Sequence, residues 1–256
     1  MKPAPRPRVF FSFRSPFSWM AIERLLRAAP DAMDEMTFIP FWEPDPATAE
    51  AMLQRGAVLH YAAMSKAKHL YILQDTKRLA KALGLPMQWP VDVRPWWEPS
   101  HLAWLKARRL GRAREFYAAV VAARWHRAEN ISEPDVVRAI AASVGLDGDA
   151  LAGAVDDPEI RAEGVDCLVQ AYEDDIFGVP FFRLRHERFW GVDRLPLFLD
   201  AIGCREDAAL TASRLIAPLP EPALTASATD DALADVPAAV RERIGAYDVD
   251  ATGGCG

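Results

Sequence analysis

Apolar runs with strand character fall in two separate parts of this chain, and helix-like sequence fills the long region between them. The first part contains the runs Val9–Phe13 and Met36–Phe41. Between these two runs, Ile22, Leu25, Leu26 and Ala29 fall on one helical face. A strand, a helix and a strand at this spacing predict a βαβ unit with two parallel strands.

The second part is a predicted hairpin. Phe181–Leu184 and Arg188–Trp190 flank a short polar segment, and a helix is expected near 193–203. From 46 to 175, helical patterns follow one another and are interrupted at glycine and proline. The order predicts an α/β fold, in which a large all-helical insertion interrupts a βαβ…ββα sheet.

This order divides the chain into three parts. The sheet domain is discontinuous, with segments 8–45 and 176–204, and the helical insertion domain covers 46–175. Beyond Cys204 the sequence is rich in Ala, Pro, Asp and Thr, so 205–256 is predicted to be a loosely ordered extension with one helix near 236–246.

Composition excludes several classes of protein. The net charge of −6 argues against a nucleic-acid partner. The sequence contains no run of about 18 apolar residues, so no membrane-spanning helix is predicted. The N-terminal residues do not resemble a secretory signal. Three widely spaced cysteines fit a reducing compartment, so a cytoplasmic protein is expected. Cys167 and Cys204 are predicted to be core thiols, and no histidine or cysteine spacing predicts a metal site.

The segment Ser15-Pro16-Phe17-Ser18 lies between the first strand and the first helix. Serine followed by proline is a favoured helix start. Thiol–disulfide oxidoreductases carry C-x-x-C at this place, with the first sulfur at the helix N-terminus. Both sulfurs are absent here, which argues against a protein disulfide oxidoreductase.

Two further segments accompany this turn: Gly178-Val179-Pro180 and Phe189-Trp190-Gly191-Val192-Asp193-Arg194. With the helical segment 68–78, of pattern K-x-x-Y-x-x-x-D-x-x-R, they resemble the DsbA-like thioredoxin superfamily. The resemblance covers about 8–203 and is strongest to its branch of 2-hydroxychromene-2-carboxylate isomerases and kappa-class glutathione transferases. It implies a thioredoxin-like sheet.

The resemblance also implies a site for glutathione, or another low-molecular-weight thiol. In that family the serine that matches Ser15 is catalytic and hydrogen-bonds the sulfur of glutathione. A residue matching Val179, before a cis-proline matching Pro180, pairs with the cysteinyl backbone. The γ-glutamyl end is held by positions that match Gly191, Val192, Asp193 and Arg194, with Asp193 as acceptor for the α-ammonium group.

The expected function is therefore that of a glutathione-dependent isomerase, or of a transferase similar to the kappa class. Its substrate would be a small, hydrophobic aromatic electrophile, and a homodimer is compatible with the resemblance. The expected substrate residues are Phe17, Trp19, Tyr71, Trp96 and Trp97. The alternative is a binding or accessory protein that keeps the fold without catalysis.

Simpler readings of the same residues stay open at this point. Ser15 and Asp193 are each a plausible helix N-cap, and Tyr71 and Asp75 share a helical face that lines a pocket or carries a surface hydrogen bond. A basic run either attracts a carboxylated substrate or covers a solvated helix face. Its members are Lys106, Arg108, Arg109, Arg112 and Arg114.

Overall fold

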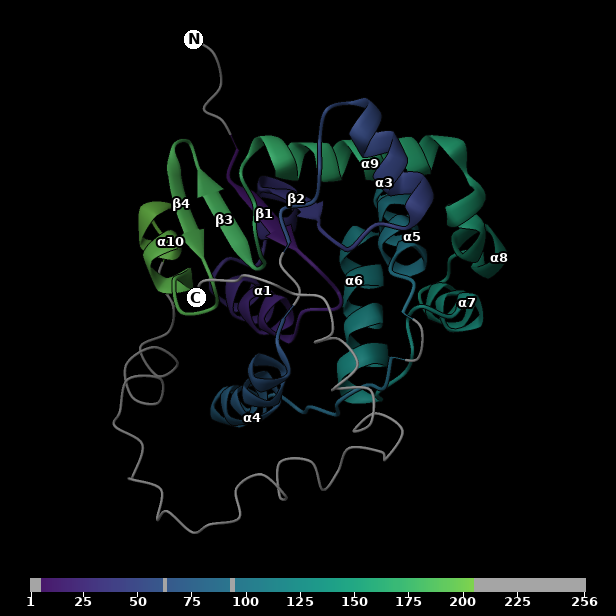
Figure 1. The fold of residues 1–256 in the computed structure, drawn as a ribbon. Coiled ribbons are helices and arrows are strands. Elements are labelled where there is room, and N and C mark those ends of the chain that lie inside the picture. Colours follow the sequence, from purple (N-terminus) through teal and green to yellow (C-terminus); the bar gives the residue numbers. More distant parts are fainter. Residues whose placement is uncertain (1–5, 62–63, 93–94, 205–256) are drawn as a thin grey trace.

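The computed structural model describes residues 6–61, 64–92 and 95–204 (Figure 1). The predictions for the extension 205–256 lie outside these residues. Among the residues that it describes, no helix is both long and apolar enough to span a membrane.

The sheet has four short strands in the order β2-β1-β3-β4. β1 (Arg8–Phe11) lies parallel to β2 (Thr37–Pro40) and antiparallel to β3 (Phe181–Leu184). β3 forms the hairpin with β4 (Glu187–Trp190), in the register Phe182 opposite Phe189. The predicted parallel unit and the predicted hairpin are both confirmed.

Helices make up the rest of the described chain. α1 (Pro16–Ala28) and the short α2 (Ala32–Glu35) connect β1 to β2, and α10 (Leu195–Ala201) follows the hairpin. The block between β2 and β3 contains α3 (Pro46–Gln54), α4 (Lys66–Ala82), α5 (Glu98–Arg109), α6 (Ala113–Val121), α7 (Pro134–Ser143), α8 (Gly148–Ala152) and α9 (Pro158–Glu173). A π-helical turn, Ala122–His126, extends α6, and a 3₁₀ turn, Gly153–Asp156, precedes α9.

The α/β class with a helical insertion is therefore confirmed. All four strands come from 8–45 and 176–204, and the helices of the block come from 46–175. Figure 1 shows the hairpin and α10 at one side of the molecule and α7 and α8 at the opposite side, with α4 below α1. The expected boundaries between domains stay a prediction, and α2 was not anticipated.

One hydrophobic core joins the sheet to the helical block. The ring of Phe11 in β1 contacts Trp104 of α5 at 5.1 Å and Tyr117 of α6 at 5.8 Å, both edge to face. On α10, Phe198 stacks on Phe182 of β3 at 4.8 Å. Because β1 is central in the sheet and its side chains are buried, the turn that follows it rests on a packed support.

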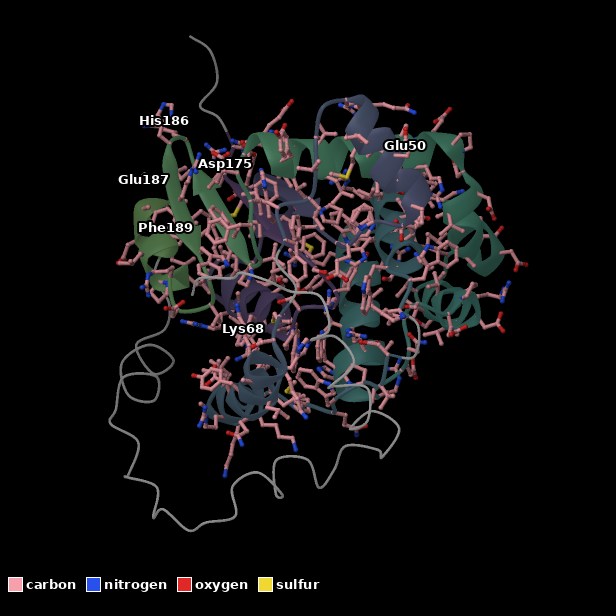
Figure 2. The ribbon with its side chains drawn as sticks, viewed as in Figure 1. Glu50, Lys68, Asp175, His186, Glu187 and Phe189 are labelled. Atoms are coloured by element: carbon pink, nitrogen blue, oxygen red, sulfur yellow. The ribbon has the colours of Figure 1, made fainter. Side chains whose placement is uncertain are left out.

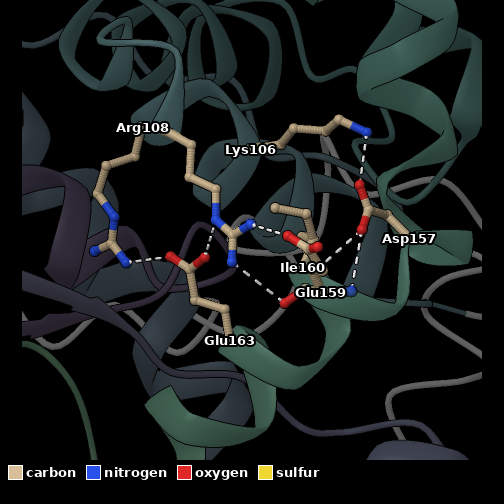
Figure 3. A network of polar contacts seen from close by, with 7 residues as sticks. Lys106, Arg108, Asp157, Glu159, Ile160 and Glu163 are labelled. Atoms are coloured by element: carbon tan, nitrogen blue, oxygen red, sulfur yellow. Dashed lines mark hydrogen bonds and ion pairs between the residues drawn. The ribbon is translucent and has the colours of Figure 1, made fainter.

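Three members of the basic run, Lys106, Arg108 and Arg109, lie on α5. Figure 3 shows these side chains directed at acidic residues of α9 and of the turn before it. Arg108 and Arg109 share the carboxylate of Glu163 at 2.7 and 2.5 Å, and Lys106 contacts Asp157 at 2.9 Å. These three cations join α5 to α9 and its N-cap, so they do not form an open anion site. Arg112 instead pairs with Glu115, and Arg114 is exposed on α6, as the solvated-face interpretation expects.

Several polar side chains lie at the periphery (Figure 2). Glu50 on α3, Lys68 on α4 and His186 at the hairpin tip are exposed. Within the described residues, no cluster of three or more His, Cys, Asp or Glu side chains is arranged to hold a metal ion.

Candidate functional site

Ser15 is the N-cap of α1. Its Oγ accepts a hydrogen bond from the Ser18 N–H at 3.1 Å, and Pro16 occupies the first helical turn. The hydroxyl proton is directed at the Val179 carbonyl over 3.4 Å, which is a long hydrogen bond. The cap therefore uses a lone pair of the oxygen, while the proton can turn toward a better acceptor at the helix N-terminus.

The Val179-Pro180 bond is cis, and Val179 lies beside the N-terminus of α1, as expected. Val179 is half-buried. Among the described residues, its N–H has no hydrogen-bond partner. A backbone donor, a backbone acceptor and the Ser15 hydroxyl therefore meet at one place.

The segment 191–194 is attached to both of these features. The Gly191 N–H donates to the Pro180 carbonyl at 3.0 Å, and Arg24 of α1 donates to the Val192 carbonyl at 2.9 Å. Gly191 has a φ of +98°, which favours glycine, and the Asp193 carboxylate lies where a Cβ would project. The segment is thus held against α1 and the cis-proline.

Asp193 is not the cap of the last helix. α10 begins at Leu195 with Arg194 in the N-cap position. The Asp193 side chain is 67% exposed and pairs with Arg194 at 2.5 Å. Its carboxylate is accessible from solvent on the segment that borders Val179 and Pro180.

Arg14 directly precedes Ser15 in the turn. Its guanidinium binds Glu43 at 2.5 Å and lies 5.7 Å from the ring of Tyr61 and 5.6 Å from that of Trp97. Burial raises the pKa of Tyr61, so its phenol is protonated near neutral pH. No signal in the sequence indicated Tyr61 or Glu43, because both reach Arg14 from loops distant along the chain.

The five expected substrate residues differ in how far their side chains are exposed. Trp19 and Trp97 are buried, with exposed fractions of 1% and 3%, so neither ring is open to a substrate in this structure. Phe17 and Trp96 are half-buried. Tyr71 is 58% exposed on α4, with Arg78 over its ring and bound to Asp75, so this group lies on the surface.

Two cysteines lie within the described residues, and both are free thiols. Cys167 is buried, as predicted, and burial raises the pKa of its thiol to about 12. Cys204 is half-buried at the end of the described chain. Burial therefore disfavours the thiolate of Cys167, which is the reactive form of a cysteine.

Comparison with known proteins agrees with this geometry. The family model of the DsbA-like thioredoxin domain matches residues 8–203. A 2-hydroxychromene-2-carboxylate isomerase of Sphingobium xenophagum is 28% identical over 193 residues, which cover 73% of this chain and 92% of the relative.

Two solved structures show the same fold. One is a 2-hydroxychromene-2-carboxylate isomerase with a TM-score of 0.59 and 24% identity, covering 77% of this chain and 94% of that one. The other is the cytosolic disulfide reductase DsbM from Pseudomonas aeruginosa with GSH. It has a TM-score of 0.50 and 17% identity, and the match covers 77% of this chain and 98% of that one.

Proposed function

Because this chain belongs to the DsbA-like thioredoxin domain family and carries serine in place of both active-site sulfurs, we propose that it is a glutathione-dependent isomerase. The observation that carries the proposal is the Ser15 hydroxyl at the N-terminus of α1, 3.4 Å from the Val179 carbonyl. The isomerase relative and the isomerase structure support this reaction class. A transferase acting on an aromatic electrophile is the second candidate, because it would use the same thiol site.

The residues present fit a small thiol peptide. The unpartnered N–H and the carbonyl of Val179 offer one donor and one acceptor to an extended backbone, in the manner of an added strand. The exposed Asp193 carboxylate suits an α-ammonium group. The structure of DsbM with GSH supports glutathione as the thiol, and other low-molecular-weight thiols are to be tested beside it.

Bound glutathione would supply a sulfur nucleophile that adds reversibly to a conjugated substrate. Ser15 would donate its hydroxyl proton to that sulfur and favour the charged form. The N-terminus of α1 acts in the same direction, because its free N–H groups carry partial positive charge. The cap bond from the Ser18 N–H holds the oxygen while the proton turns.

The deciding experiment is titration calorimetry with glutathione, followed by assays with a chromene carboxylate and a chloro-dinitro aromatic. Binding with turnover of the chromene carboxylate supports the isomerase, and turnover of only the chloro-dinitro compound supports the transferase. Binding without turnover of either compound favours the accessory protein. Absence of binding by glutathione and by other thiols refutes the proposed site.

Asp193→Asn is expected to weaken glutathione binding by about 1.5–3 kcal/mol, the range for a hydrogen bond to a charged group. The melting temperature should change little, because the side chain is exposed and does not cap α10. Asp200→Asn, an exposed acid on α10 itself, is the matched control and should bind normally. Equal affinities of the two variants would remove Asp193 from the site.

Arg14 and Glu43 are expected to influence a carboxylated substrate in opposite directions. Arg14→Leu should raise KM for the chromene carboxylate about tenfold, near the lower limit for one lost hydrogen bond to a charged group. Glu43→Gln should lower this KM, because it removes the carboxylate that competes for the guanidinium. The uncharged chloro-dinitro substrate is the control, and parallel changes in its KM would mean that Arg14 acts only through the fold.

A further inference from the structure

A buried histidine supports the turn that carries Ser15. His101 lies on α5 with an exposed fraction of 0%, and its ring packs between Trp42 at 5.1 Å and Phe13 at 5.2 Å. Its Nε2 lies 3.1 Å from the Phe13 N and 3.3 Å from the Ser12 Oγ. Its Nδ1 lies 2.6 Å from the Trp97 carbonyl oxygen.

These partners determine the protonation state of the ring. A carbonyl only accepts, so Nδ1 must carry a proton, and Nε2 must then accept from the Phe13 N–H. A second proton on Nε2 would face that N–H and break the contact. Burial lowers the pKa of His101 to about 3, so the neutral ring persists across the working pH range.

Ser12 connects His101 to Ser15 through hydrogen bonds. The Ser12 hydroxyl donates to His101 and accepts from the Arg14 N–H at 3.3 Å. The Ser12 carbonyl accepts from the Ser15 N–H at 3.1 Å, and the Ser12 N–H donates to the Ser18 Oγ at 3.3 Å. Each polar group of Ser12 therefore holds a neighbouring part of the turn.

We propose that His101 is a positioning residue, which acts through Ser12 to hold the Ser15 hydroxyl in the direction that a bound thiolate requires. The inference rests on the proposed thiol site and adds residues that do not contact the ligand. An apolar side chain would fill the space between Trp42 and Phe13 without the cost of burying a polar ring. The imidazole instead meets two polar groups of the turn, one of them an N–H that would otherwise be buried without a partner.

Ser12→Ala is the central test, because it removes the hydroxyl with little change of volume. Its kcat with glutathione and the chromene carboxylate should fall about tenfold, since small misplacements of a reacting group reduce rates strongly. The bound thiol, followed by ultraviolet absorbance, should titrate at higher pH, while KM for glutathione changes little. Ser12→Thr keeps the hydroxyl and should restore kcat, and His101→Phe should behave as Ser12→Ala does.

Ser132→Ala is the matched control. Ser132 is also buried, and its Oγ accepts a backbone N–H, that of Trp96, at 3.1 Å. This variant should lower the melting temperature by a similar amount and leave the thiol titration unchanged. An equal shift of the thiol titration in Ser12→Ala and Ser132→Ala, or no rescue by Ser12→Thr, would overturn the positioning role.

Hydrogen exchange separates this inference from the proposed function. In Ser12→Ala the amides of residues 13–18 should exchange faster than in the parent protein, whereas Ser132→Ala should leave them unchanged. If glutathione does not bind the parent protein, the proposed function fails, and faster exchange still identifies Ser12 and His101 as supports of the turn. If exchange does not change, the positioning inference fails even when glutathione binds.

Discussion

Ser15→Ala should raise the pKa of enzyme-bound glutathione by roughly one to two units and lower turnover. One lost hydrogen bond to a charged sulfur corresponds to about 1.5–3 kcal/mol, at about 1.4 kcal/mol per pKa unit. Affinity for the thiol should remain largely intact, because Val179 and Asp193 would supply separate contacts. Some preference for the thiolate should persist, since the N-terminus of α1 remains in the variant. Titration of the bound thiol by ultraviolet absorbance measures the shift.

The capping role of Ser15 requires a control. Removing this cap should also destabilise the protein by about 1 kcal/mol. Ser65 caps α4 through the Lys68 N–H in the same way, so Ser65→Ala should show a similar loss of stability and an unchanged bound thiol. If Ser15→Ala behaves like Ser65→Ala in every measurement, Ser15 is only a helix cap. Ser15→Cys restores one sulfur and should form a mixed disulfide with oxidised glutathione.

Asp92→Ala should destabilise the protein by about 3–5 kcal/mol, the cost of breaking a buried ion pair on one side. Asp92 holds Arg124 through two hydrogen bonds of 2.9 and 2.8 Å. The Arg124 side chain is 3% exposed and lies over the rings of Trp97 and Trp125 at 5.0 and 4.8 Å. The variant would leave this guanidinium charged, buried and without its carboxylate. Urea denaturation followed by tryptophan fluorescence gives the free energy of unfolding.

Asp135→Ala provides the comparison at the surface. Asp135 also pairs with an arginine, Arg138, but its side chain is 91% exposed, so its loss should cost about 0–1 kcal/mol. Replacing both partners, as Asp92→Leu with Arg124→Met, should recover part of the stability, because no buried charge remains. Equal losses for Asp92→Ala and Asp135→Ala would show that the buried pair carries no special weight.

The positions of the strands and of the turn at Ser15 could be predicted from neighbouring residues in the sequence. Apolar runs and a helical stripe of period 3.6 identify β1, α1 and β2, because neighbours in sequence create these patterns. Ser15-Pro16 marked the start of α1 for a similar reason: cap and first turn are formed by adjacent residues. The absence of both sulfurs, which decides against dithiol chemistry, is a property of the sequence itself. The long-range contacts around the site did not follow from such patterns.

Only the tertiary structure decided which side chains meet around Ser15. His101 reaches the Phe13 N–H across 88 positions of the chain, and the Ser15 hydroxyl reaches the Val179 carbonyl across 164. The spacing of apolar and polar residues along the sequence does not indicate which distant residues form such hydrogen bonds. The same holds for Tyr61 beside Arg14, and for Lys106, Arg108 and Arg109, whose acidic partners lie about fifty positions away on and near α9. The sequence by itself determined the strands, most of the helices and the chemistry of the turn. Long-range packing decided which side chains surround that turn, because burial and pairing depend on residues that meet only after folding.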